Sequence, residues 1–174
     1  MLGGLWMFGI GIIEMPKLPV TWADIYYGLQ RELLDCEDVS MYAEKCIEEG
    51  NDNFLVLELA WKPEDRQEML EEVKELVKED ELRKSKTKWL YYLLTQVMEE
   101  DLTFDEWSSE INRIYALFDY PKEMDKCVPY MPSADGYNPS KHTARENQIR
   151  LKENTMSYIN ELRREIVFKK EEDI

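Results

Sequence analysis

The chain has 174 residues, of which 44% are hydrophobic, and its 37 acidic and 22 basic residues give a formal net charge of -15 at pH 7. This length favours one domain with a buried core, and five Trp and ten Tyr exclude a disordered chain. The negative charge argues against nucleic acid or an anionic membrane as a partner, because Lys and Arg bind phosphate groups, and it favours a basic protein.

The N-terminal residues 1–13, MLGGLWMFGIGII, are almost wholly apolar. The run lacks a preceding basic region, is followed by Glu14 and is shorter than the ~20 residues of a membrane-spanning helix. Its four glycines make it a poor helix former. We therefore interpret residues 1–15 as an apolar N-terminal extension and residues 16–174 as a single all-helical domain of a soluble, cytoplasmic protein.

Three helices are expected in the first third of the chain. Thr21 and Asp24 have capping-box spacing at the start of a helix over residues 21–34. Asp35 is expected to cap a second helix, which ends at Gly50. The run FLVLELAW at residues 54–61 resembles a buried strand, but no partner strand is evident, so a short buried helix is expected.

The remaining segments also have helical signals. Pro63 is expected to begin a long acidic helix over residues 63–83, followed by helices over 85–100 and 104–118. A short helix is expected in residues 121–128. The last helix is expected over residues 144–168, and its inward stripe is Ile149, Met156, Ile159, Leu162 and Ile166.

No period-two pattern or hairpin signal is present in the sequence. The predicted fold is all-α: a single-domain helical bundle, or a short stack of helical hairpins, with seven to eight helices. The three cysteines, Cys36, Cys46 and Cys127, form no CxxC pair, so neither a zinc site nor a disulfide framework is predicted. Buried free thiols in a reducing cytosol are expected.

The segment between Phe118 and Leu151 holds four of the seven prolines and the single histidine. Residues 129–142, named here the Tyr/Pro loop, form a long connection of the kind that is functional or disordered in most proteins. Its Tyr130, Met131 and Tyr137 favour an ordered loop attached to the protein body. One interpretation is a structural clamp that ties the last helix to the bundle, and the other is a binding loop with aromatic anchors.

Enzyme signatures are weak. His142 has no nucleophile motif around it, and no phosphate-binding glycine loop occurs. Glu71, Glu72 and Glu75 read EExxE, which resembles half of the magnesium signature of all-helical nucleoside triphosphate pyrophosphohydrolases. The ExxD half that would complete the metal cage does not follow, so a solvated helix face is the alternative interpretation.

The acidic residues are unevenly distributed. Residues 44–81 contain fourteen acids and five bases, and residues 99–110 contain six acids and no base. A charge run is commonly a solubilising surface. In the second window, however, repulsion among the acids is not compensated within the segment, and a basic partner would neutralise it.

Several motifs resemble an uncharacterised bacterial family, domain of unknown function 2247. They include WADI at residues 22–25, LELA at 57–60, KWLY at 88–91 and IYALFDYP at 114–121, and the most specific block is YMPSADGYNPSKHTARENQIRL at 130–151. The resemblance implies a small, acidic, helical bacterial protein, of the sort encoded beside secreted polymorphic toxins. Immunity proteins of this sort bind and block a cognate toxin, commonly a basic nuclease.

The leading hypothesis is a non-enzymatic immunity protein that neutralises a basic, nuclease-type toxin domain without cofactor or metal. The alternatives are a Mg-dependent helical nucleotide hydrolase that uses Glu71, Glu72 and Glu75, and a regulator that mimics nucleic acid. The partner-binding site would consist of acidic side chains, which attract the basic partner, and aromatic side chains, which anchor it. Its expected residues are Glu99, Glu100, Asp101, Asp105, Glu106, Glu110, Tyr120, Tyr130, Asp135 and Tyr137.

Overall fold

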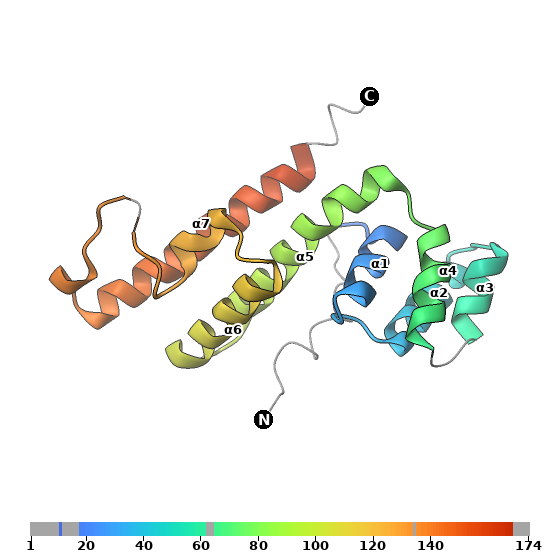
Figure 1. Ribbon diagram of the computed structural model, residues 1–174, viewed down its shortest axis with the longest axis horizontal. Coiled ribbons are helices and arrows are strands. Elements are labelled where there is room, and N and C mark those ends of the chain that lie inside the picture. Colours follow the sequence, from blue (N-terminus) through green and yellow to red (C-terminus); the bar gives the residue numbers. More distant parts are fainter. Residues whose placement is uncertain (1–10, 12–17, 62–64, 134, 169–174) are drawn as a thin grey trace. The chain divides into compact units, whose positions relative to one another are not determined.

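The computed structural model describes residues 11, 18–61, 65–133 and 135–168. Within these ranges every regular element is a helix and no residue lies in a strand (Figure 1). The predicted all-α helical fold is therefore confirmed, and the seven α-helices of the described ranges agree with the expected number. Apart from Gly11, the apolar extension at residues 1–15 lies outside the described residues, as does Pro63.

The chain divides into two compact units, Met1–Trp89 and Leu90–Ile174, and the boundary between them falls inside one helix, α5. The first unit holds α1 (Trp22–Gln30), α2 (Cys36–Glu48), α3 (Phe54–Trp61), α4 (Arg66–Glu75) and the first half of α5 (Glu79–Glu99). The second holds the end of α5, α6 (Phe104–Leu117), the short 3-10 helices η3 (Lys122–Cys127) and η4 (Pro139–Lys141), and α7 (Ala144–Phe168).

A fully buried carboxylate, Asp24, connects α1 to the first half of α5. Asp24 accepts hydrogen bonds from the Thr21 backbone N–H at 2.9 Å, which closes the predicted capping box. It also accepts from the Ser85 hydroxyl at 2.7 Å and from the Lys88 ammonium at 2.6 Å. The Trp89 indole N–H donates to the Asp24 backbone carbonyl at 2.8 Å. A buried charge is tolerated when it is paired and hydrogen-bonded in this way.

Gly28 allows α1 to approach α5 closely. A Cβ at this position would lie 2.4 Å from Cζ2 of Trp89 and 2.8 Å from Cδ1 of Leu34, which is closer than real Cβ contacts. Trp89 and Leu34 are themselves buried, so neither side chain has free volume into which it can shift. Glycine is required here by packing rather than by a turn.

The predicted long helix over residues 63–83 is wrong. α4 ends at Glu75 and α5 begins at Glu79, so the chain breaks at residues 76–78. α4 buries Val73, and α5 buries Ser85 against α1. In one unbroken helix these two residues, twelve apart, would point about 120° away from each other. The break allows α4 and α5 each to turn a buried face towards α1.

The run at residues 54–61 forms α3, as predicted, but only one face of this helix is buried. Val56, Leu59 and Ala60 are buried, while Phe54 and Trp61 are 69% and 85% exposed. α3 packs against α2, where the Ser40 hydroxyl donates to the Leu59 carbonyl at 2.9 Å. The expectation of a buried helix is therefore right for one side and wrong for the other.

In the second unit, Trp107 of α6 is buried, stacks on Phe104 and donates its indole N–H to the Met98 sulfur at 3.4 Å. α7 has the predicted bounds, but its predicted stripe is wrong at two positions. Ile149 and Met156 are 48% and 45% exposed, because the buried face of α7 is centred about 100° around the helix axis from these two residues. The buried residues of α7 are Thr155, Tyr158, Ile159, Leu162 and Ile166.

All three cysteines are free thiols, as expected. Cys127 is buried, as predicted, but Cys36 and Cys46 are only half-buried, so the prediction of buried thiols is wrong for these two. Burial raises the pKa of the Cys127 thiol to about 11 and also raises the pKa of Cys46. Cys46 and Cys127 are therefore packed, weakly ionised side chains rather than activated nucleophiles.

Candidate functional site

Four acidic side chains of the second unit form a group that we name the acidic turn: Glu99, Glu100, Asp101 and Asp105. They lie at the end of α5, in the connection and in the first turn of α6, and all four are exposed. Among the described residues, none of them has a basic partner within ion-pair distance. The connection therefore presents concentrated, unneutralised negative charge to solvent.

Two other acids of the predicted site are held locally. Glu106 accepts hydrogen bonds from the Thr103 N–H at 2.9 Å and from the Thr103 hydroxyl at 2.7 Å, which complete the predicted capping box. These bonds lower the pKa of Glu106. Glu110 pairs with Arg113 at 3.1 Å, and its side chain is only 16% exposed. The repulsion expected within residues 99–110 is thus partly relieved by a base that lies just beyond that window.

Tyr120 and Tyr130 are 63% and 62% exposed. The Tyr120 ring meets the buried Tyr115 ring edge-on, with ring centroids 5.2 Å apart, and both exposed tyrosines lie close enough to Tyr115 to raise its pKa. The leading cause of that rise, to about 12, is the hydrogen bond from the Tyr115 hydroxyl to Asp125 at 2.5 Å. Tyr120 therefore packs against a supported aromatic ring, and both tyrosines present their own rings to solvent.

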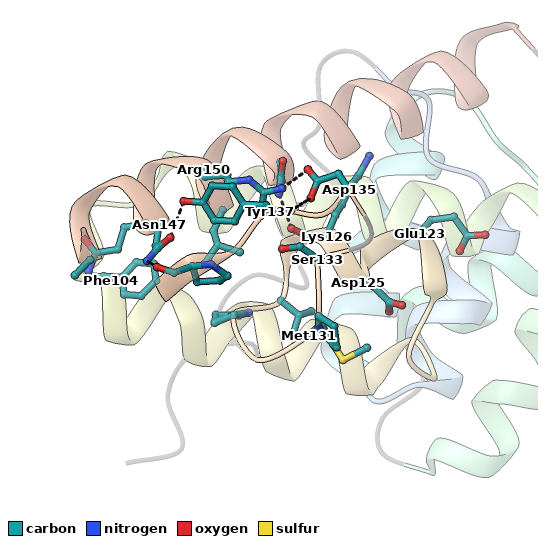
Figure 2. A pocket seen from close by; sticks show the side chains of 18 of the residues that line it. Phe104, Glu123, Asp125, Lys126, Met131, Ser133, Asp135, Tyr137, Asn147 and Arg150 are labelled. Atoms are coloured by element: carbon teal, nitrogen blue, oxygen red, sulfur yellow. Dashed lines mark hydrogen bonds and ion pairs between the residues drawn. The ribbon is translucent and has the colours of Figure 1, made fainter. Parts of the chain in front are cut away.

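Tyr137, in contrast, is occupied by contacts within the protein (Figure 2). Its ring stacks on His142, with centroids 4.5 Å apart, and the Arg150 guanidinium lies 3.9 Å from its ring centroid. Its hydroxyl donates to Asn147 Oδ1 at 2.7 Å, and the Asn147 amide donates to the Pro139 carbonyl at 3.1 Å. These contacts fix the Tyr/Pro loop on the first turns of α7.

Asp135 takes part in the same arrangement. Its carboxylate accepts the Tyr137 N–H at 3.1 Å and pairs with Arg150. These contacts, the Tyr137 N–H first, lower the pKa of Asp135. Gly136, between the two residues, has a φ of +76°, a conformation in which glycine has no steric penalty. The loop is therefore ordered by Asp135 and Tyr137 together, which supports the clamp interpretation for these two residues.

A cavity of about 620 Å³ lies beneath the loop (Figure 2). Its wall includes Phe104 from α6, Lys126 from η3, Met131 from the loop, and Asn147 and Leu151 from α7. Lys126 pairs with Glu161 at 2.8 Å, and its carbonyl accepts from the Asn154 amide at 2.8 Å. The cavity wall thus comes from three helices and the loop, and contacts between η3 and α7 hold one side of it.

The structure brings some of the predicted site residues together and separates others. The Asp135 carboxylate accepts a hydrogen bond from the Tyr137 N–H within the loop. Tyr120 packs edge-on against Tyr115, and both Tyr120 and Tyr130 raise the pKa of Tyr115. The acidic turn and Tyr120 lie beyond opposite ends of α6, which is about 20 Å long. A partner that contacts both would have to span the length of that helix, which is the scale of a standard protein interface.

Sequence reasoning missed Asn147 and Arg150, which lie on one face of α7 and hold Tyr137. A usable signal was present in the Thr143–Glu146 capping box, whose Thr143 N–H bonds to Glu146 at 2.7 Å. This box fixes where α7 starts and so places residues 147 and 150, three apart, side by side. The cavity had no comparable signal, because sequence spacing does not show how residues 122–154 fold around it or that Phe104 completes its wall.

Glu71, Glu72 and Glu75 lie in the last two turns of α4. Glu71 and Glu75 are exposed, Glu72 is half-buried, and Glu71 accepts from the Gln67 amide at 3.3 Å. Within the described ranges, no group of three or more His, Cys, Asp or Glu side chains is arranged to hold a metal ion. Likewise, none of the described helices has the length and apolar character of a membrane span. The hydrolase alternative stays a hypothesis.

The sequence model of one bacterial family matches residues 10–163, which is most of the chain. The family, DUF2247, is described as uncharacterised protein conserved in bacteria. No curated protein and no solved structure matches the chain.

Proposed function

Because the chain belongs to the bacterial DUF2247 family, for which no activity is established, we propose from its residues that it is a non-enzymatic binding protein for a basic protein partner. We propose further that it acts as an immunity protein in the cytoplasm of the producing cell, where it blocks a basic, nuclease-type toxin domain. The observation that carries the proposal is the acidic turn, whose four exposed carboxylates have no basic partner among the described residues.

Exposed charge of one sign increases the rate at which an oppositely charged protein is encountered. Affinity would come from side chains that bury apolar area, and Tyr120 and Tyr130 present exposed rings for this purpose. Tyr137 and Asp135 would support the surface from within, because their contacts fix the loop that carries Tyr130. The contact surface would then include both ends of α6.

The proposal is tested by capture of partners from lysate of the native strain on the immobilised protein, washed at low and then at high salt. Mass spectrometry of the eluate should identify one basic protein of toxin-like size that elutes with salt. The same protein should lose its toxic activity when it is mixed with the purified chain. A captured partner that retains full activity would contradict the immunity role.

Charge reversal then tests the acidic turn in particular. Glu100→Lys combined with Asp101→Lys should slow association with the captured partner by about tenfold at low salt, and less at high salt, because the steering field is screened. Stopped-flow association rates measure this effect. Glu165→Lys with Glu153→Lys on α7 is the control of equal charge change, and an equal effect of both variants would remove the acidic turn from the proposal.

A further inference from the structure

The outer face of α3 carries three exposed apolar side chains, Phe54, Leu57 and Trp61, which we name the α3 outer face. Their exposed fractions are 69%, 37% and 85%. The spacings of three, four and seven residues place them on one side of the helix, opposite the buried Val56, Leu59 and Ala60.

A helix that is apolar on all sides is normally buried on all sides. Among the described elements, α2 and α4 make the main contacts with α3. Single exposed apolar residues are ordinary, but a Phe and a Trp aligned along two helical turns form a contiguous patch. Aromatic side chains are also the residues that protein interfaces favour most. The α3 outer face therefore has the composition of a contact surface for another protein.

The charged residues that lie near α3 in the sequence define the kind of partner that fits this face. Residues 44–61 hold five acids and one base. Glu48 and Glu49 end α2, Asp52 lies two residues before Phe54, and all three are exposed. Glu58 follows Leu57 on α3 itself. An apolar stripe with an acidic rim complements a helix that has apolar residues on one side and Lys or Arg at its edges.

We propose that the α3 outer face docks a basic amphipathic helix of a protein partner. The apolar side of that helix covers Phe54, Leu57 and Trp61, and its basic side chains meet the acids of residues 44–58. The distance from Phe54 to Trp61 is about 10 Å along the axis, which matches two turns of a partner helix. This inference rests on the proposed function for the basic character of the partner, and it adds a second contact surface in the first unit.

A second copy of the chain is a poorer occupant of this face. Symmetric pairing would bring the acids of one copy against the same acids of the other, and like charges at an interface are unfavourable. A bilayer with anionic lipids is disfavoured for the same reason. A basic helix neutralises the rim while it covers the apolar stripe.

The test uses the full chain and a fluorescein-labelled peptide of Leu and Lys, about 18 residues long, patterned as an amphipathic helix. Fluorescence anisotropy at low and at moderate salt measures the dissociation constant. The test variant is Phe54→Ser with Trp61→Ser. The matched control is Ile149→Ser with Val167→Ser, which removes two exposed apolar side chains from α7. Circular dichroism before titration confirms that both variants keep their helix content.

The wild-type chain and the control should bind the peptide with similar affinity. The Phe54→Ser/Trp61→Ser variant should bind at least about tenfold more weakly, as expected when interface aromatics are removed. Glu48→Gln with Glu49→Gln should weaken binding at low salt only. Equal binding by the test variant and the control, or no binding to the wild-type chain, overturns the proposal.

Three further outcomes would also overturn it. A scrambled Leu/Lys peptide that binds equally well would show a response to charge alone. Sedimentation that reveals a concentration-dependent dimer, lost in the Phe54→Ser/Trp61→Ser variant, would identify a second copy as the occupant. Stronger binding to phosphatidylcholine vesicles than to the peptide would identify a lipid surface instead.

The experiments can contradict the proposed function and the docking surface independently of each other. If the wild-type chain captures a basic protein from lysate and the Phe54→Ser/Trp61→Ser variant captures it equally well, the binding role stands and the docking surface is wrong. If lysate gives no basic partner but the peptide binds through Phe54 and Trp61, the docking surface stands and the toxin partner is wrong.

Discussion

At the residue scale, Asp24 has the largest predicted effect on stability. Its buried carboxylate compensates the charge of Lys88, whose side chain is only 12% exposed, and accepts the Ser85 hydroxyl. Asp24→Asn should lower the free energy of unfolding by about 3–5 kcal/mol, because it leaves a buried ammonium without its counter-ion. Urea denaturation measures the change. Asp52→Asn, at an exposed position, is the control, and an equal shift in both variants would contradict the assigned role.

A second residue-scale prediction concerns pH. The Thr143 backbone N–H, and then its hydroxyl, hold the pKa of Glu146 below its ordinary 4.5. The unfolded chain therefore binds this proton more tightly than the folded chain does. The stability that Glu146 contributes is complete above its ordinary pKa and is lost as pH falls through the lowered folded pKa.

Replacement of this carboxylate should accordingly reduce the acid sensitivity of the protein. Between about pH 5.5 and pH 3, the urea midpoint of the wild-type chain should fall more steeply than that of Glu146→Gln. The pKa of Asp135 is also below its ordinary value. Asp135→Asn should therefore also make the urea midpoint depend less steeply on pH than it does in the wild-type chain. Parallel curves for the wild type and both variants would show that these hydrogen bonds do not persist in solution.

At this scale, the sequence predicted only contacts between residues a few positions apart. The capping boxes that begin α1, α6 and α7 follow from pairs three residues apart, such as Thr103 and Glu106. The partners of Asp24 lie 61 and 64 residues away, and no sequence spacing indicates such contacts. The ion pair between Asp135 and Arg150, fifteen residues apart, was not predicted for the same reason.

At the element scale, the Tyr/Pro loop can be tested as a clamp. Tyr137→Ala should destabilise the protein by about 1–2 kcal/mol, because ring stacking and a hydrogen bond are lost together, and Tyr137→Phe should cost about half of that. Thermal melts report the stability change, and limited proteolysis reports release of residues 129–142. Tyr130→Ala, with its exposed ring, should leave both readouts unchanged. If Tyr137→Ala melts like the wild type, the loop is not held by this residue.

Helix identity was predictable at this scale because caps and apolar periodicity are local features. The bounds of α7 came from them, whereas α3 was predicted only because no partner strand was evident for residues 54–61. The break between α4 and α5 was not predictable, because residues 76–78, Leu-Val-Lys, are compatible with a helix by themselves. The break is imposed by the two buried faces that must both reach α1, and tertiary packing outweighs local propensity here.

At the scale of the whole molecule, α5 connects the two compact units. Trp89 is buried in the first unit, while Leu93 and Leu94 are buried in the second, and all three belong to one uninterrupted helix. Unfolding of either unit would therefore expose part of a helix that the other unit needs. Scanning calorimetry should show a single transition whose calorimetric and van't Hoff enthalpies agree. Two separate transitions would contradict the prediction of a single domain.

The two proposed contact surfaces belong to different units. The acidic turn and the exposed tyrosines lie in the second unit, and the α3 outer face lies in the first. The proposal of a basic partner came from composition, because the net charge of the chain is -15. It did not indicate the α3 outer face, because FLVLELAW has the sequence of a core segment and only packing determines which of its faces is covered.

The close contact between Gly28 and Trp89 has a consequence for how the family can diverge. A side chain at position 28 has no space while a Trp fills position 89, and a smaller residue at 89 leaves a void while position 28 is a glycine. Neither replacement is neutral alone, and a smaller residue at 89 does not suffice, because a Cβ at position 28 would still lie 2.8 Å from Cδ1 of Leu34. A substitution at position 28 is therefore expected to lower stability unless the side chains at positions 34 and 89 change with it.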